Sequence, residues 1–171
     1  MSLNAPRTVE DLLNYRLARL MLATSAPGVR LLEGRFGITR RQWGLLGVLA
    51  QHGPLSPTEL SLHSRLPTSK VSLHIADFVA RGLVSREVLP GDRRRARLVL
   101  TQAGRQLFES AFPQLAALSV AMLSALSPEE VQTLDGLMRK LGEAAQRFSA
   151  QQPVAEKADR RRGGTRRLQG S

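Results

Sequence analysis

The chain has 171 residues, and 42% of them are apolar, which is enough for one ordinary domain with a packed core. Cysteine is absent, which excludes disulfides, thiolate metal sites and thiol redox sensing. Lys and Arg number 25 against 14 Asp and Glu, and this net charge of +11 indicates an anionic polymer or surface as partner. Aromatic residues make up only 4%, which argues against a base-stacking platform for single strands.

The positive charge is concentrated in two segments. Residues 39–101 carry ten cations and four anions, and residues 153–171 carry six cations and two anions. Residues 102–152 are almost neutral, with four cations and five anions. The last segment has too few apolar residues to fold, so we expect residues 151–171 to form a disordered basic tail. That tail is either a solvated terminus without a role or an arm that binds phosphates non-specifically.

The sequence gives no sign of a membrane segment or a secretory signal. The longest weakly polar run, 115–126, is shorter than the roughly 20 residues that cross a bilayer. Arg16 and Arg19 interrupt the first apolar stretch. We therefore expect a cytoplasmic protein without a membrane partner.

Helix signals dominate the first third of the chain. The first helix is expected from about residue 9 to 26, and Pro27-Gly28 is a place where it can break before a second piece through Leu31-Leu32. The next helix is expected over about residues 40–51. Thr39 with Gln42, Ser56 with Glu59 and Ser127 with Glu130 fit the capping box that begins a helix.

Two short helices and a hairpin follow. The helices are expected over residues 57–65 and 68–81, and Gly82 ends the second. Helical spacing gives the second helix a core stripe, formed by Val71, Ile75, Phe78 and Val79. The period then changes to that of two strands, 83–89 and 96–101, which flank a basic tip at Pro90–Arg95.

Two helices are expected to complete the chain. The first runs from Thr101 to about Leu126 with a kink at Pro113. The second has apolar residues at alternating spacings of three and four, an a/d seam that indicates packing against another subunit. This seam comprises Val131, Leu134, Met138, Leu141, Ala145 and Phe148.

Helix, turn, helix and basic hairpin form the layout of a winged helix-turn-helix. An α-helix fits the major groove of duplex DNA, and an Arg-bearing hairpin tip reaches the adjacent minor groove. The alternative for the tip is a charged, solvated loop. The predicted fold class is therefore mainly α with a small β-wing, a winged helix-turn-helix lobe joined to a helical dimerisation region.

The hairpin and the residues after it resemble the MarR family of bacterial transcriptional regulators. The resemblance rests on Gly82-Leu83-Val84, Arg86, Asp92-Arg93-Arg94, Leu98, Leu100-Thr101 and Gly104-Arg105. It implies a homodimer in which residues 1–38 and 102–150 form the dimerisation region and residues 39–101 the DNA-binding lobe. Two lobes would then read a pseudo-palindromic operator with half-sites about 10 bp apart. In the family's wing motif the Asp, here Asp92, braces the Arg that enters the minor groove, here Arg94.

The candidate DNA-binding residues lie on the two short helices and the wing. Ser56 and Thr58 are expected to contact phosphates at the start of the first short helix. The remaining candidates are Thr68, Ser69, Lys70, Ser72, Leu73, Asp92, Arg93, Arg94 and Arg95. Leu73 departs from the family, which often has Arg there, and leucine contacts a thymine methyl instead of pairing with guanine.

The resemblance also implies a small aromatic acid as effector. Tyr15 and Arg16 are candidate ligand-binding residues, because Arg16 could pair with a ligand carboxylate. The alternative for Arg16 is an ion pair between subunits. His52, His63 and His74 are eleven residues apart, which places no two of them on one helix face at ligand distance, so we expect no metal and no cofactor.

The sequence thus predicts a dimeric, sequence-specific regulator of transcription that binds double-stranded DNA. We expect a repressor that a small molecule releases from its operator. The alternative is a non-specific architectural protein that binds DNA or RNA. An enzyme is not expected, since the chain lacks a nucleophile–base set, a carboxylate pair and a phosphate-binding loop.

Overall fold

The computed structural model describes residues 2–88 and 96–151, which form two compact units. Unit 1 spans residues 1–123 and unit 2 spans residues 124–171. Unit 1 contains a 3₁₀ turn at Val9–Asp11, then α1 (Leu13–Arg35), α2 (Arg40–His52), α3 (Pro57–Ser64), α4 (Thr68–Ala80), β1 (Val84–Val88), β2 (Ala96–Leu100) and α5 (Gln102–Leu123). Unit 2 contains α6 (Pro128–Ala150). The predicted fold class is confirmed. In the part of the chain that the structure describes, no single helix is long and apolar enough to cross a membrane.

Helices α2, α3 and α6 begin at the capping boxes that the sequence predicts. At the start of α2 the Thr39 hydroxyl accepts a hydrogen bond from Gln42 N at 3.3 Å, and Gln42 Oε1 accepts one from Thr39 N at 2.8 Å. Ser56 and Glu59 exchange the same two bonds at the start of α3, at 3.2 and 2.7 Å. The start of α6 has the same arrangement. Each box satisfies two backbone N–H groups that a helix end leaves without a partner.

Helix α1 continues through Pro27, so the expected break there is wrong. A proline inside a helix costs about 3 kcal/mol, because it removes one hydrogen bond and crowds the preceding turn. Packing against α5 offsets this cost. Gly28 lies so close to α5 that a Cβ atom on it would be 3.3 Å from Leu115 Cδ2, and Leu32 farther along is buried.

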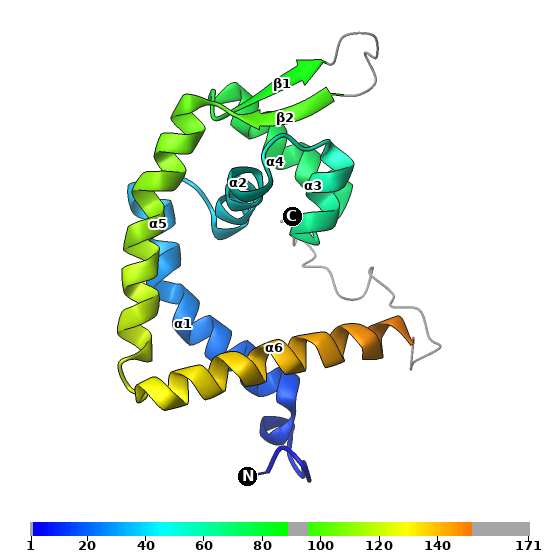
Figure 1. Ribbon diagram of the computed structural model, residues 1–171, viewed down its shortest axis with the longest axis vertical. Coiled ribbons are helices and arrows are strands. Elements are labelled where there is room, and N and C mark those ends of the chain that lie inside the picture. The colour runs from blue at the N-terminus through cyan, green and yellow to red at the C-terminus, as the bar shows by residue number, and fades with distance from the viewer. Residues whose placement is uncertain (1, 89–95, 152–171) are drawn as a thin grey trace, which may run out of the picture. The chain divides into compact units, whose positions relative to one another are not determined.

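Figure 1 shows α2, α3, α4 and the hairpin grouped together, and most buried side chains of unit 1 belong to these elements. β1 and β2 pair antiparallel, with Val84 opposite Leu100 and Val88 opposite Ala96. Leu55 adds an isolated bridge to Leu98 and so ties the hairpin to the segment before α3. The buried apolar side chains are Leu32, Ile38, Leu45, Leu46, Leu49, Leu55, Leu60, Val71, Ile75, Phe78, Leu83, Val84, Leu98, Leu100 and Ala111.

A close backbone approach joins α5 to the end of α4. Gly82 has φ +66°, a conformation that favours glycine, and it ends α4 as the sequence predicts. The Thr101 hydroxyl donates to Gly82 O at 2.7 Å and accepts from Gly104 N at 3.1 Å. A Cβ atom on Gly104 would overlap the carbonyl oxygen of Leu83. The Thr-x-x-Gly spacing therefore permits the first turn of α5 to dock on the backbone between α4 and β1.

Candidate DNA-binding site

Helix α4 presents one face to the core and the opposite face to solvent. Val71, Ile75 and Phe78 are buried, which fixes the rotation of the helix about its axis. The predicted DNA-binding residues of α4 are all exposed in consequence, and they are Thr68, Ser69, Lys70, Ser72 and Leu73. Leu73 is 63% exposed although it is apolar. The arrangement matches the recognition helix of a helix-turn-helix.

The turn between α3 and α4 is held by side-chain hydrogen bonds. Arg65 adopts a left-handed conformation with φ 55°, which ends α3. The Ser61 hydroxyl donates to Leu66 O at 2.6 Å, and the Thr68 hydroxyl donates to Ser61 Oγ at 3.3 Å. Thr68 therefore has a structural partner in the turn. Its predicted contact with DNA stays a prediction.

Two of the predicted phosphate-contacting residues lie at the start of α3. Ser56 is half-buried, and its hydroxyl oxygen already accepts the bond from Glu59 N. Thr58 is exposed. Pro57 has no N–H group and the capping box engages Glu59 N, so Thr58 N is the backbone donor of this turn that can meet an anion.

The base of the wing is attached to the start of α3. Arg97 on β2 donates to Glu59 Oε2 at 2.8 Å and to Pro54 O at 3.3 Å. The pKa of Glu59 is lowered, first by the hydrogen bond from the Ser56 backbone and also by the nearby Arg97 guanidinium. The wing-tip candidates Asp92, Arg93, Arg94 and Arg95 lie outside the described residues.

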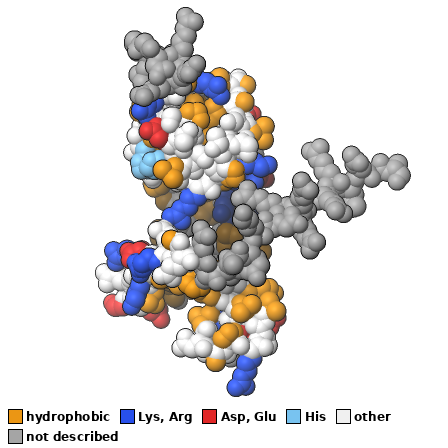
Figure 2. All heavy atoms as spheres, turned by 90° about the vertical axis from the view of Figure 1, so that its right-hand side faces the viewer, with side chains coloured by type: hydrophobic (Ala, Val, Ile, Leu, Met, Phe, Trp, Pro, Cys, Tyr) orange, Lys and Arg blue, Asp and Glu red, His pale blue; other side chains and the backbone are white. Residues whose placement is uncertain are grey.

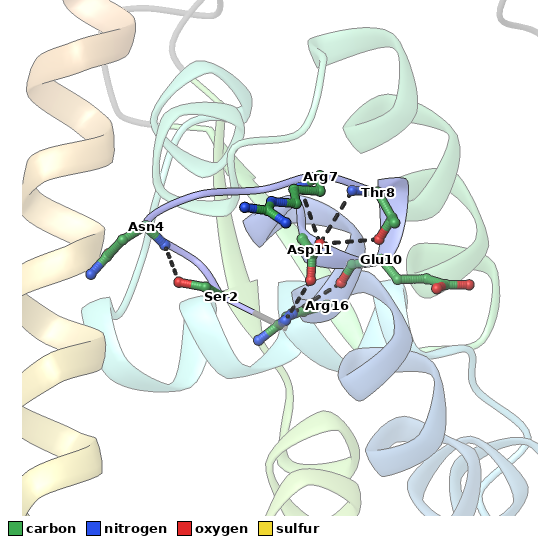
Figure 3. A network of polar contacts seen from close by, with 7 residues as sticks. All are labelled: Ser2, Asn4, Arg7, Thr8, Glu10, Asp11 and Arg16. Carbon is green, nitrogen blue, oxygen red and sulfur yellow. Dashed lines mark hydrogen bonds and ion pairs between the residues drawn. The ribbon is translucent and has the colours of Figure 1, made fainter.

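A polar network surrounds the start of α1 and engages Arg16 within its own chain (Figure 3). The buried Asp11 carboxylate accepts hydrogen bonds from Arg7 N, Thr8 N and the Thr8 hydroxyl. Arg16 Nη2 lies 3.2 Å from Asp11 Oδ1, and Arg16 Nε donates to Glu10 O at 3.0 Å. The bond from the Arg7 backbone contributes most to lowering the pKa of Asp11. Arg16 was expected to pair with a ligand or a second subunit, and in this structure its charge is balanced by Asp11.

Tyr15 and Arg16 nevertheless border an open hollow. With Glu10 and Arg19 they line a space of about 480 Å³, and the Arg19 guanidinium lies 6.0 Å from the centroid of the Tyr15 ring. Their role in ligand binding stays a prediction.

A larger and more apolar hollow of about 570 Å³ is lined by residues of α2 and α5. The Trp43 and Phe108 rings stack with centroids 4.6 Å apart, and Phe112 continues the aromatic row from Phe108 at 5.8 Å. The other lining residues are Gly44, Gly47, Val48, Gln51, Leu115, Ala116, Ser119 and Val120. The sequence did not predict this site, because the site depends on how α2 packs against α5. In the structure Trp43 is only partly buried.

Two histidines meet although their spacing in the chain did not predict it. His52 at the end of α2 and His63 on α3 have ring centroids 4.2 Å apart. Histidine side chains form a patch on the face drawn in Figure 2. The expectation that no two lie close considered a single helix only, and the pair forms between two helices. Among the described residues, no group of three or more His, Asp or Glu gathers as metal ligands.

The geometry therefore defines a winged helix-turn-helix DNA-binding protein. A sequence model of the MarR family matches residues 36–95. The transcriptional repressor MdtR of Bacillus subtilis is 30% identical over 110 residues, which are 64% of this chain and 71% of MdtR. The fold resembles Bordetella bronchiseptica BpsR, with TM-score 0.71 and 23% identity over 81% of this chain and 98% of BpsR. It also resembles Staphylococcus aureus MepR bound to DNA, with TM-score 0.69 and 22% identity over 81% of this chain and 99% of MepR.

The chain belongs to the MarR family of transcriptional regulators. Its relatives are DNA-binding regulators and not enzymes, so the function class expected from the sequence is confirmed. The likenesses to BpsR and MepR, at less than 25% identity, support the fold.

Proposed function

We propose that this regulator is a homodimeric repressor that leaves a pseudo-palindromic operator when a small aromatic acid binds. Residues 39–101 act as the DNA-binding lobe, and residues 1–38 and 102–150 act as the dimerisation region. The exposed face of α4 reads bases, and Thr58 and Ser56 meet phosphates. The arginines of the wing tip reach the minor groove, with Asp92 as the brace of Arg94. Residues 151–171 add a basic arm.

Uncovered apolar side chains on two separate helices support the homodimer. In α6 none of the residues is buried, and Leu134, Leu137, Met138, Leu141 and Phe148 are exposed. In the first half of α1 the exposed apolar residues are Leu13, Leu17, Leu20, Met21 and Leu22. Several large apolar side chains exposed on one helix are typical of a surface that a partner covers. The near-neutral charge of residues 102–152 lets two copies meet without repulsion.

The observation that carries the proposed release is the apolar hollow between α2 and α5. One wall belongs to the DNA-binding lobe and the other to a helix of the dimerisation region. A flat aromatic ligand beside Trp43 and Phe108 would touch both walls. It would favour one arrangement of the two regions over another, which shifts the population of DNA-binding dimers. The solved structure of BpsR concerns regulation of its DNA binding by 6-hydroxynicotinic acid, and this supports the ligand class.

A binding assay with the DNA upstream of its own gene tests the proposal. We expect fluorescence anisotropy to show tighter binding to one site than to competitor DNA, and 6-hydroxynicotinic acid or a similar aromatic acid to weaken it. Equal affinity for all DNA would contradict sequence-specific repression.

Light scattering tests the homodimer. It should give the mass of two chains, and Met138→Lys should reduce it to one. Gln132→Lys, a polar position on the same helix, serves as the matched control.

Deleting residues 153–171 distinguishes the regulator from an architectural protein. The regulator should keep its site preference and lose affinity about equally for all DNA, because an arm that contacts phosphates adds no sequence information. An architectural binder should lose most of its binding.

A further inference from the structure

The exposed face of α4 carries one large apolar side chain, that of Leu73. Leu73 is 63% exposed, while the core-facing Val71, Ile75 and Phe78 are buried. Its exposed neighbours one helical turn away are Ser69, Lys70 and Ala76. A leucine in this position gains little from the fold of its own chain, because most of its side chain is exposed.

The polar neighbours of Leu73 discriminate poorly among bases. A serine hydroxyl both donates and accepts, so Ser69 and Ser72 suit any base edge. Lys70 is a point charge on a flexible stem, and it contacts phosphate as readily as guanine. Leu73 presents the largest apolar surface on this face, larger than the single methyl of Ala76, and apolar surface distinguishes bases by chemistry. The C5 methyl of thymine is the apolar feature of the major groove.

We propose that Leu73 is the specificity-determining residue of α4 and reads a thymine methyl in each half-site of the operator. The proposal rests on the proposed function as a sequence-specific DNA-binding dimer. The partner is duplex DNA and not a protein, because the lobe that bears Leu73 carries ten cations and four anions. Burial of Leu73 against a methyl group gives a favourable contact that guanine and cytosine lack.

Replacement of thymine by deoxyuridine tests this contact, since it removes only the methyl and leaves every hydrogen-bonding group. The operator is first selected from random duplexes by the full-length protein. Each thymine is then replaced in turn. We expect one position in each half-site to weaken binding about threefold to fivefold, the factor for one buried methyl group.

Two substitutions of Leu73 test the same contact from the side of the protein. Leu73→Ala should bind more weakly overall and lose its sensitivity to deoxyuridine at that position, because the contact is already gone. Leu73→Arg should prefer guanine there, through a bidentate contact to O6 and N7. Leu62, which is 76% exposed on α3, supplies the matched control, and Leu62→Ala should keep the base preference of the original chain. Both alanine variants should unfold at the original temperature because neither leucine is in the core.

Equal sensitivity of Leu73→Ala and the original chain to every deoxyuridine would overturn the proposal. The same holds if no thymine methyl matters, an outcome that would point to a protein partner for this face. Failure of the proposed function looks different, because selection from random duplexes would then enrich no sequence at all.

Discussion

The Gln42 side-chain amide on α2 donates a 2.8 Å hydrogen bond to the Asp77 carboxylate on α4. Gln42 is buried, and its Oε1 atom caps the start of its own helix. Arg81, one turn beyond Asp77, donates to Gly37 O at 3.1 Å and lies 3.4 Å from Asp77 Oδ2. These bonds tie the end of the recognition helix to the junction between α1 and α2. We therefore expect a movement of the junction between α1 and α2 to shift α4 as well, because these side chains connect the two.

Replacing Asp77 by Ala should loosen this connection. The buried Gln42 N–H group loses its partner, and we expect about 1 kcal/mol less stability, since Asp77 itself is partly exposed. Operator affinity should fall as well because α4 is held less firmly. Asp77→Asn, which keeps a carbonyl acceptor, is the matched control. Thermal unfolding and DNA anisotropy measure both effects, and an unchanged melting temperature in Asp77→Ala would contradict the role assigned to the bond.

Lowering the pH should weaken the attachment of the wing to the start of α3. The Ser56 backbone and Arg97 hold the pKa of Glu59 below its ordinary value of 4.5. A carboxyl group with a lowered folded-state pKa stabilises the fold above the unfolded pKa, and this contribution is lost as the pH falls through the folded value. We expect the melting temperature to fall below about pH 4.5, and to fall less steeply in Glu59→Gln, which retains an N-cap partner. Identical pH profiles would show that Glu59 contributes nothing.

Gly104 should tolerate no side chain. An alanine Cβ would overlap the Leu83 carbonyl oxygen, so the first turn of α5 must move away from the backbone before β1. Overpacking of this kind costs about 1–3 kcal/mol, and the melting temperature should drop by several degrees. Gly44→Ala on α2 is the control, because a Cβ there meets nothing within 4 Å and alanine favours a helix. Equal melting temperatures for the two variants would contradict the close approach.

Local signals in the sequence predicted the elements well and their contacts poorly. The capping residues Thr39 and Ser56 fixed two helix starts, because a cap acts within four residues. The break expected at Pro27 is wrong because packing of Gly28 on Leu115, 87 residues away in the chain, decides the outcome. Propensity contains no information about that contact.

The same holds for the candidate site: local spacing predicts which residues are exposed, but not the contacts between helices. The exposed face of α4 follows from helical spacing, so the exposure of Ser69, Lys70 and Leu73 could be predicted from the sequence. The pairing of His52 with His63 and the bond from Gln42 to Asp77 depend on how α2 sits against α3 and α4. The hollow beside Trp43 depends likewise on the distance between two helices, which residue types alone do not encode.

Filling that hollow should separate effector response from DNA binding. Ala116 lines the space opposite Trp43, and Ala117 next to it is exposed and does not line it. A phenylalanine at position 116 occupies the volume that a flat ligand needs, while the DNA-reading face of α4 is untouched. We expect Ala116→Phe to bind the operator normally and to ignore aromatic acids. Ala117→Phe should respond like the original chain.

Trp43 provides the measurement, because it is the only tryptophan in the chain and it lies in the wall of the hollow. Its fluorescence should be quenched when 6-hydroxynicotinic acid or benzoic acid is titrated into the original chain or Ala117→Phe. Quenching should be absent in Ala116→Phe, because the ligand no longer reaches the stacked pair of Trp43 and Phe108. Equal quenching in both variants would show that the ligand reaches Trp43 without occupying the volume at position 116, and would contradict this placement of the effector. A chain that no aromatic acid quenches would contradict the hollow as an effector site, since a flat ring bound there must lie against the indole.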